Sequence, residues 1–449
     1  MSTSDATATV VDPVALRRTI VATAAGNMVE WFDFGVFSYI AVTLGAVFFP
    51  EASAPAQLLS TFATFAAAFL VRPLGGLFLG PLSDRIGRKR VLVLTVLMMA
   101  FGTFAVGLLP GYAQIGVWAP ILLLVARLVQ GFSTGGEYGS AMTFIAEHAP
   151  DRRRGFMGSW LEFGTLAGYV LGAALVTWLT AVLPPEDLLA WGWRVPFLVA
   201  GPLGLAGLYL RLRLAETPAY GHLERRTPHR DTRMSNELKQ IFRYQRRPFL
   251  VCAGLVLVFN VTAYMLTSYL PSFLSEEIGL STATGLAVVL GVMVLLMALL
   301  PFVGHLSDRV GRRPVLLAGC LLLVVGAVPA FLVIRERTVP SAVIGCLLVA
   351  LMYVCFDSTM PGTLPALFPT DVRAGALSIS YNISVSLFGG TTPFVTTALV
   401  DATDNLLVPG FILAAGGAIG AVAVLLMPET AGKPLPAAPP VLAALGDRA

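Results

Sequence analysis

Long uninterrupted apolar runs constrain the fold of this chain more than any other feature of its sequence. Residues 91–109, 193–210, 282–303 and 405–427 are examples, and each is close to the roughly 20 residues that an α-helix needs to cross a bilayer. Of the 449 residues, 56% are hydrophobic and only 12% are charged, whereas soluble domains carry roughly 25% charged residues. The sequence therefore predicts an all-α membrane protein with many spans.

Charged and Pro/Gly-rich breaks divide the chain into twelve predicted spans. Their approximate limits are 19–48, 57–80, 90–109, 116–146, 155–182, 193–212, 248–274, 282–303, 314–334, 340–366, 374–400 and 405–427. The longest internal break separates six spans from six. We therefore expect an N-terminal segment, a six-helix bundle, a linker, a second six-helix bundle and a tail, at 1–18, 19–212, 213–247, 248–427 and 428–449.

The distribution of lysine and arginine predicts the orientation. The two terminal segments and every second loop hold 25 of the 30 basic residues, and loops rich in such residues stay in the cytoplasm. The first 16 residues lack the apolar core of a signal peptide. We therefore expect a multi-pass protein of the cell membrane with both termini cytoplasmic. The opposite face should carry mainly acids: Glu51, Glu186, Asp187, Glu276, Glu277, Glu336, Asp401 and Asp404.

Three short motifs recur in the same order in both halves and indicate an internal duplication. "GPLSDRIGRKR" (80–90) recurs as "GHLSDRVGRRP" (304–314), "PDRRRG" (150–155) as "PTDVRAG" (369–375), and "AETPA" (215–219) as "PETAG" (428–432). The offsets are 224, 219 and 213 residues, as a duplicated six-helix unit requires. Two parallel six-helix halves around a central substrate site are a known plan of secondary transporters.

The first of these motifs carries an aspartate that membrane anchoring does not explain. Basic residues alone would anchor the loop at the inner leaflet, whereas an aspartate there can cap a helix or pair with an arginine. We expect both copies to form latches that hold one conformation and release in the other. The expected latch residues are Asp84, Arg85, Arg88, Asp308, Arg309 and Arg312.

Taken together, these motifs resemble those of the major facilitator superfamily, in which D-R-x-G-R-[KR] follows spans 2 and 8. "GNMVEWFDFGVFSY" (26–39) and "QGFSTGGEYGSAMTFIAEHAP" (130–150) are similar to its metabolite:proton symporters. "NVTAYMLTSYLPSFL" (260–274) and "TLPALFPTDVRAGALSISYNIS" (363–384) resemble proline/glycine betaine transporters. The resemblance implies proton symport of a small zwitterionic osmolyte by alternating access, driven by the proton gradient without a cofactor. The tail from 431 is short and lacks the heptads of osmosensing members, so osmotic regulation does not follow.

Ionisable residues inside the predicted spans are costly to bury and are therefore functional candidates. They are Glu30, Asp33, Arg72, Arg127, Glu137, Glu162 and Asp357. Arg72 is expected about two turns from the charged motif, where a structural pairing and a functional role both remain open. Glu162 can face either the cavity or the latch. Asp357 is either a specificity determinant or a packed, hydrogen-bonded group.

Spans 1 and 4 each carry a polar stripe at helical spacing. Glu30 and Asp33 lie on neighbouring faces of span 1, and Arg127, Gln130 and Glu137 lie within one arc of span 4. We expect Arg127 to pair with a carboxylate of span 1. The similarity to the Asp–Arg couple of proton-linked sugar porters implies proton coupling by Glu30, Asp33, Arg127 and Glu137. The alternative is a static buried ion pair.

A proline or betaine substrate also needs a site for its cationic group. Aromatic faces attract quaternary ammonium by about 0.5–2 kcal/mol each, and side-chain amides can add hydrogen bonds. Each of these side chains can instead be part of the core. The expected substrate-binding residues are Asn27, Trp31, Phe34, Gln130, Trp160, Asn260, Tyr264, Asp357, Tyr381 and Asn382.

Other functions find less support in the sequence. No H-E-x-x-H, G-x-S-x-G or P-loop motif indicates an enzyme, and no His or Cys spacing indicates a metal site. The basic residues are explained by topology, so nucleic acid is not an expected partner. The open alternatives are a symporter of a carboxylate such as 2-oxoglutarate, citrate or shikimate, and a sensor or receptor without transport.

Overall fold

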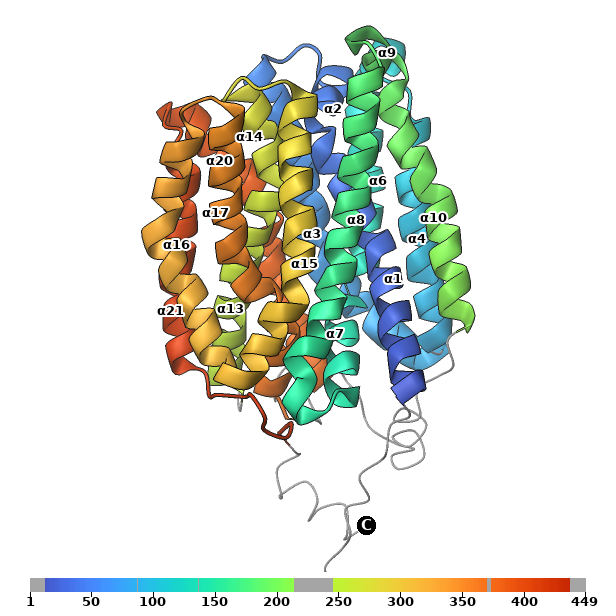
Figure 1. Cartoon of the computed structure of the whole chain (residues 1–449). Helices are drawn as coiled ribbons and strands as arrows, with labels where there is room; N and C mark the ends of the chain where they lie inside the picture. Colours follow the sequence, from blue (N-terminus) through green and yellow to red (C-terminus); the bar gives the residue numbers. More distant parts are fainter. Residues whose placement is uncertain (1–12, 87, 136, 214–244, 370–372, 437–449) are drawn as a thin grey trace, which may run out of the picture.

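The computed structural model describes residues 13–86, 88–135, 137–213, 245–369 and 373–436, and all the regular structure in these ranges is helical. Most of the predicted linker lies outside them. Figure 1 shows two groups of upright helices side by side, the N-terminal half in blue to green and the C-terminal half in yellow to red. Because the helices run upright, most of them end at the top or at the bottom of this view, and these are the two ends of the molecule.

The described N-terminal half contains the helices α1 (Pro13–Tyr39), α2 (Ala41–Phe48), α3 (Ala54–Ile86), α4 (Arg88–Leu108), α5 (Tyr112–Ile115), α6 (Trp118–Thr134), α7 (Glu137–His148), η1 (Asp151–Arg153), α8 (Arg154–Val182), α9 (Pro185–Ala190), η2 (Gly192–Arg194) and α10 (Val195–Arg213). The described C-terminal half contains α13 (Arg246–Tyr264), η3 (Met265–Tyr269), α14 (Leu270–Glu276), α15 (Thr282–Val310), α16 (Arg312–Ile334), α17 (Val339–Asp357), α18 (Met360–Thr363), η4 (Leu364–Leu367), α19 (Arg373–Ser384), η5 (Val385–Gly389), α20 (Thr392–Thr403) and α21 (Val408–Leu426).

These helices follow the twelve predicted spans, but several spans are broken. Eight described segments are long and apolar enough to cross a membrane, and α1 and α2 form a further one with a 63° bend between them. Spans 7 and 11 contain the π-helical segments η3 and η5. Such local widenings of a helix are frequent at functional sites, and both lie at mid-span here.

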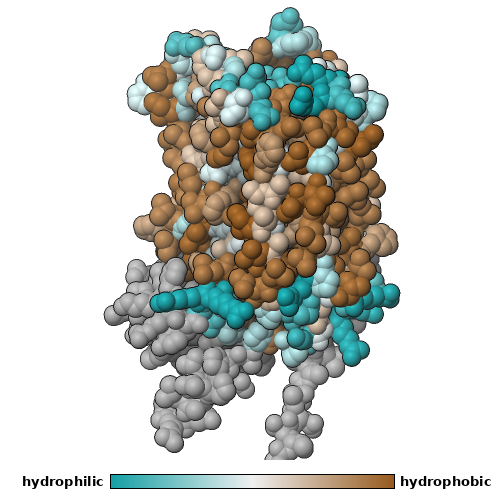
Figure 2. All heavy atoms as spheres, turned by 90° about the vertical axis from the view of Figure 1, so that its left-hand side faces the viewer, coloured by the Kyte–Doolittle hydropathy of each residue, from teal (hydrophilic) through white to brown (hydrophobic). Residues whose placement is uncertain are grey.

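The lateral surface is that of a membrane protein. Figure 2 shows a hydrophobic band between two hydrophilic ends. Among the most exposed apolar side chains are Phe78, Phe101, Phe302 and Val325, at 69%, 72%, 74% and 72%. We call the end with Arg152, Arg153 and Arg309 the basic end, drawn at the bottom of Figure 1, and the end with Glu186 and Asp187 on α9 the acidic end.

Close helix packing within the N-terminal half depends on glycine. A Cβ at Gly131 of α6 would overlap the carbonyl oxygen of Ala68 on α3, and one at Gly168 of α8 would overlap the carbonyl oxygen of Met28 on α1. Because backbone meets backbone at these points, no side chain can move aside to make room. The glycine ladders therefore set the spacing of α1, α3, α6 and α8, as small residues do in membrane helices.

The two halves contact each other along α8 and α15 and along α3 and α20. At the basic end, a Cβ at Gly304 of α15 would come within 3.0 Å of the Ser159 side chain on α8. Towards the acidic end, the Tyr39 hydroxyl lies 3.7 Å from the Met293 sulfur. At mid-height, Ser386 of η5 donates to the Phe69 carbonyl over 2.6 Å. The halves are therefore closed against each other at both ends.

Substituting Gly131 by alanine tests the glycine packing. The added methyl group has no space against α3, so we expect Gly131→Ala to lower the free energy of unfolding by about 1–3 kcal/mol, measured by thermal unfolding in detergent. The matched control is Gly291→Ala on α15, where an added Cβ meets nothing within 4 Å. That variant should be unchanged or up to about 1 kcal/mol more stable. Equal loss of stability in both variants would contradict the packing argument.

Candidate functional site

A buried ion pair links α1 to α6 in the N-terminal half. Nη1 of Arg127 lies 3.4 Å from Oδ2 of Asp33, and the two side chains are almost completely buried. Gln130 donates to the same carboxylate oxygen over 2.9 Å and accepts from Arg127 over 2.8 Å. It also lies 2.6 Å from the Thr103 hydroxyl. The pairing of Arg127 with a carboxylate of span 1, expected from helical spacing, is therefore present.

This ion pair is incompletely satisfied. Oδ1 of Asp33 and both Nε and Nη2 of Arg127 have no hydrogen-bond partner within the described ranges. The guanidinium instead lies over the Phe37 ring, at 4.0 Å from its centroid. Removing one partner of a buried pair typically costs about 3–5 kcal/mol, because it leaves an uncompensated charge. A proton on Asp33 would have the same consequence for Arg127, so the pair can respond to protonation.

Arg72 lies deeper than the sequence indicated. Its span was expected to end near residue 80, but α3 continues to Ile86, so Arg72 is at mid-helix and completely buried. One Nη lies 3.9 Å from Oε1 of Glu30. None of its three nitrogens has a hydrogen-bond partner in the described structure, and the guanidinium lies 5.2 Å from the Phe69 ring centroid. An arginine with unused donors in the core is a ready binding group for a carboxylate.

Beside Arg72, a cluster of aromatic rings crosses between the two halves. The Phe69 ring lies 5.2 Å from Tyr264, which lies 6.3 Å from Trp31, which lies 6.0 Å from Tyr138. Tyr138 in turn lies 4.8 Å from Tyr381. All these side chains are buried. Such a cluster can surround the cationic group of a ligand without a full counter-charge.

Two of the expected amide residues, Asn27 and Asn260, lie next to the aromatic cluster. Asn27 donates to Thr165 over 2.5 Å and accepts from the Trp31 indole over 3.1 Å, so it holds that ring in place. Asn260 donates to the Val256 carbonyl of its own helix over 2.9 Å.

Two expected substrate residues lie elsewhere. Trp160 is half-buried and its ring contacts are Phe156 and Phe163 of its own helix, so the structure does not bring it to the central cluster. Asn382 donates to the carbonyl of Gly135 on the other half over 2.5 Å. Its amide therefore joins the two halves in this conformation.

Three tyrosines at the centre were not predicted as site residues. Tyr138 donates to Glu162, Tyr353 donates to Asp357 over 2.8 Å, and the Tyr169 ring lies 5.6 Å from Trp31. The i, i+4 spacing of Tyr353 and Asp357 is a signal that the sequence does contain. The contact of Tyr138 with Glu162 joins α7 to α8 and has no such local signature. The Glu137 side chain lies outside the described part of the chain.

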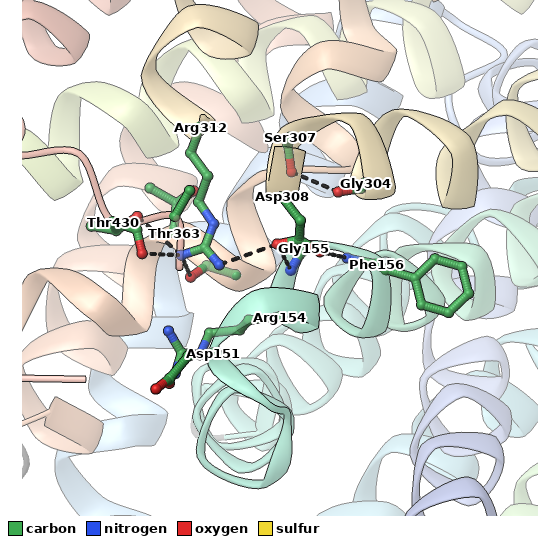
Figure 3. Close-up of polar contacts among 12 residues, drawn as sticks. Asp151, Arg154, Gly155, Phe156, Gly304, Ser307, Asp308, Arg312, Thr363 and Thr430 are labelled. Atoms are coloured by element: carbon green, nitrogen blue, oxygen red, sulfur yellow. Dashed lines mark hydrogen bonds and ion pairs between the residues drawn. The ribbon is translucent and has the colours of Figure 1, made fainter. Parts of the chain in front are cut away.

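At the basic end, Asp308 of α15 caps a helix of the opposite half. Its two carboxylate oxygens accept from the backbone N–H groups of Gly155 and Phe156, each over 2.8 Å. Figure 3 shows this carboxylate at the first turn of α8. An acidic side chain there satisfies free N–H groups and complements the helix dipole. Arg312 holds the same carboxylate at 3.6 Å. Asp308 and Arg312 therefore make the kind of contacts that the expected latch requires, while Arg309 is exposed.

Further contacts close the same end. Arg373 of α19 pairs with Glu147 of α7 over 2.7 Å, and Arg154 pairs with Asp151 and donates to the Lys433 carbonyl over 3.2 Å. The segment 429–436 therefore lies against both halves. The side chains of the first copy of the latch motif, Asp84, Arg85 and Arg88, are outside the described structure.

Glu429, from the repeated "PETAG" motif, caps α16. Its carboxylate accepts from the backbone N–H groups of Arg312 and Arg313 over 3.1 and 3.0 Å, and from those of Thr430 and Ala431 over 2.8 Å each. Gly311 has φ of 104°, and a Cβ there would come within 2.8 Å of the carboxylate. The glycine of the D-R-x-G-R motif thus permits both the turn and the close approach.

Comparisons with known proteins agree with this architecture. The family model of the Major Facilitator Superfamily matches residues 23–386 and 283–445. The chain is 45% identical over 444 residues to the glycine betaine/proline/ectoine/pipecolic acid transporter OusA of Dickeya dadantii, covering 98% of this chain and 88% of that one. It is 44% identical over 437 residues to the proline/betaine transporter of Escherichia coli K12, covering 96% and 87%.

The chain belongs to the major facilitator superfamily. Both the resemblance and the predicted all-α, twelve-span fold are thereby confirmed. A crystal structure of a D-xylose–proton symporter has a TM-score of 0.71 at 21% identity and covers 93% of this chain and 99% of its own. The inward-open xylose transporter XylE from E. coli has a TM-score of 0.69 at 19% identity, with 96% and 99% covered. Like its relatives in the superfamily, the chain is a transporter and not an enzyme.

The Asp308 cap predicts a conformational effect. Asp308→Asn keeps the shape of the side chain but loses the charge that α8 and Arg312 face. The conformers that are open at the basic end should therefore be stabilised relative to the closed one by about 1–2 kcal/mol, which raises their population about five- to thirtyfold. The rate of alkylation of a cysteine introduced at Ser159, which packs on Gly304, measures this. Asp401→Asn at the opposite end is the control. An unchanged alkylation rate in Asp308→Asn would rule out the latch.

The Glu429 cap predicts a dependence of stability on pH. Burial of Glu429 raises its pKa, but four backbone N–H donors outweigh burial, so the net pKa lies below the ordinary value of 4.5. The stabilisation by the carboxylate should therefore be fully present above pH 4.5 and fall as the pH drops through the lowered pKa. Unfolding of Glu429→Gln and wild type across this range should differ by about 1 kcal/mol at neutral pH and converge in acid. A constant difference would contradict the cap.

Proposed function

We propose that this chain is a secondary active transporter that imports a small zwitterionic osmolyte, of the proline or glycine betaine kind, by proton symport with alternating access. The observation that carries the proposal is a buried arginine with unused donors, next to an aromatic cluster that bridges the two halves. The names of the relatives at 44–45% identity support the same substrate class.

Arg72 is the proposed site for the carboxylate of the substrate. Its guanidinium is fully buried, has no hydrogen bond to the described residues, and faces Glu30 at 3.9 Å, too far for a tight ion pair. A substrate carboxylate can occupy both free Nη groups in the bidentate geometry that arginine favours. Lysine at this position would keep the charge but lose that geometry.

The aromatic cluster is the proposed site for the ammonium group. Tyr264 and Tyr381 come from the C-terminal half, Trp31 and Tyr138 from the N-terminal half, so a ligand between these rings contacts both halves. The Tyr264 hydroxyl has no hydrogen-bond partner among the described side chains and is available to the substrate. A ligand that contacts both halves favours their closure, as alternating access requires.

Asp33 and Arg127 are the proposed coupling pair, with Glu30 as a second carboxylate beside them. A proton on Asp33 removes the charge that holds Arg127 and loosens the Gln130 network between α1, α4 and α6. The substrate carries no net charge, so the proton gradient supplies the driving charge for uptake. Binding and protonation therefore act on the same α1 face.

The latch at Asp308 defines the conformational cycle. We place the basic end in the cytoplasm, because basic loops face inward. In the described conformation this end is closed by the α8 cap and by the Glu147–Arg373 pair. Release of these contacts opens the central site to the cell interior.

The first test is uptake by the purified protein in liposomes with an inward proton gradient. Labelled glycine betaine and proline should accumulate, and a protonophore should abolish accumulation. Accumulation of 2-oxoglutarate alone would assign the protein to carboxylate transport. No flux of any of these compounds would favour a sensor.

Asp33→Asn separates coupling from binding. An asparagine cannot release a proton, so gradient-driven accumulation should fall at least tenfold while exchange of labelled for unlabelled substrate at equal pH continues. Glu186→Gln at the acidic end is the control and should keep both activities. Equal loss of accumulation and exchange in Asp33→Asn would indicate a purely structural ion pair.

A further inference from the structure

The proposed coupling at α1 leaves two buried acids unused. Glu162 of α8 and Asp357 at the end of α17 come from opposite halves, and both are 0% exposed. Tyr138 donates to Oε1 of Glu162, and Tyr353 donates to Oδ1 of Asp357 over 2.8 Å. Each acid therefore has one oxygen held by a tyrosine of its own half.

In the described part of the chain, the second carboxyl oxygen of each acid lacks such a tyrosine donor. Oε2 of Glu162 and Oδ2 of Asp357 have no donor among the described residues, and the two carboxyl groups contact each other. No described Arg, Lys or His forms an ion pair with either acid. An ionised carboxyl group is only an acceptor, so a hydrogen bond between these two requires a proton on one of them.

The alternative of two charged carboxylates is energetically unfavourable. Two negative charges in contact repel strongly in a medium of low dielectric constant, and neighbouring carboxyl groups avoid this by sharing one proton. Among the residues that the structure describes, the titratable side chains that interact with the pair are four tyrosines, Tyr138, Tyr169, Tyr353 and Tyr381, one each from α7, α8, α17 and α19. Their ordinary pKa near 10 keeps them neutral at physiological pH.

We propose that Glu162 and Asp357 form a second proton-binding site, which holds one proton between the halves when they are closed and releases it when they separate. In the closed form, the protonated carboxyl group of one acid donates a hydrogen bond to the carboxylate of the other. When α8 and α17 move apart, each carboxyl group is hydrated, both ionise, and the proton passes to the water in the opened cavity. The pair therefore links protonation directly to closure.

This site differs from the Asp33–Arg127 pair in what the proton does. Protonation of Asp33 breaks an attraction within one half, whereas protonation of the Glu162–Asp357 pair replaces a repulsion between halves by a hydrogen bond. Its role in coupling rests on the proposed symport. The existence of the bound proton does not, and can be tested without substrate.

Infrared spectroscopy of the purified protein tests the bound proton directly. A protonated carboxyl group has a C=O stretching band that a carboxylate lacks, and the band shifts in D₂O. Near neutral pH, wild type should show such a band, and Glu162→Gln and Asp357→Asn should each lose the same component. The amide in either variant can donate the hydrogen bond in place of the proton, so both are expected to fold.

Two controls make this experiment specific. Glu186→Gln, an exposed acid, and Asp33→Asn should both retain the component that the pair variants lose. Retention of every protonated-carboxyl component in both pair variants would overturn the proposal. So would the absence of the band in wild type together with closure that depends on Na⁺, because the pair would then bind a metal cation.

The link to closure is tested by the pH dependence of the conformation. Spin labels at Arg152→Cys and Val310→Cys, which lie on opposite halves at the basic end, report closure in a background whose four native cysteines are alanine. Because closure binds one proton, the ratio of closed to open molecules should fall tenfold per pH unit as the pH rises, over the range in which the closed form holds the proton and the open form does not. We expect this slope in wild type and Asp33→Asn, and a slope near zero in Asp357→Asn. The same slope in Asp357→Asn would overturn the proposal.

These results separate the two proposals. If wild type takes up neither betaine nor proline, the proposed function fails, while the infrared band and the slope still decide whether the pair binds a proton. If uptake is found but neither the band nor the slope depends on Glu162 and Asp357, the transporter couples without this pair.

Discussion

The cost of burying charge in a membrane protein determines the arrangement at the centre of this structure. Isolated charges are excluded from the bundle interior, and the described central charges form three sets: Arg127 with Asp33, Arg72 with Glu30, and the two acids Glu162 and Asp357. Only the first set is a close pair of opposite charges. In our proposals, each of the other two gains a better partner from outside the protein, a substrate carboxylate in one case and a proton in the other.

Polar groups at the buried ends of the helices must also be paired, and here side-chain carboxylates pair with backbone N–H groups. Buried helix N-termini carry free N–H groups, and the duplicated motifs supply the carboxylates that satisfy them. Asp308 caps α8 of the opposite half, whereas Glu429 caps α16 of its own half. The first cap must break when the halves separate and the second need not. One repeated unit thus provides both a switchable and a permanent contact, with Arg312 lying between them.

Features with a local signature could be predicted from the sequence. Apolar runs predicted the spans, and the polar stripes on spans 1 and 4 predicted that Arg127 pairs with a carboxylate of span 1. The structure identifies this carboxylate as Asp33. The depth of Arg72 was missed because α3 continues into the charged motif, as far as Ile86, instead of ending before it. The contact between Glu162 and Asp357 could not be predicted, since it depends on how α8 and α17 meet across two halves that no short-range pattern relates. The position of Trp160 away from the central rings could not be predicted either, because no short-range pattern shows which face of α8 meets them.

The charges around the aromatic cluster also bear on the choice of substrate. Arg72 lies at the Phe69 end of the rings, and the acid pair lies at the Tyr138 end through the Tyr138–Glu162 hydrogen bond. Arg127, Asp33, Arg72 and Glu30 sum to zero, and a pair that shares one proton adds a single negative charge. A zwitterion fits this gradient with its carboxylate at Arg72 and its ammonium towards the acids. A dicarboxylate would place its second charge against them, so the acids that we propose to bind the proton would also disfavour anionic substrates.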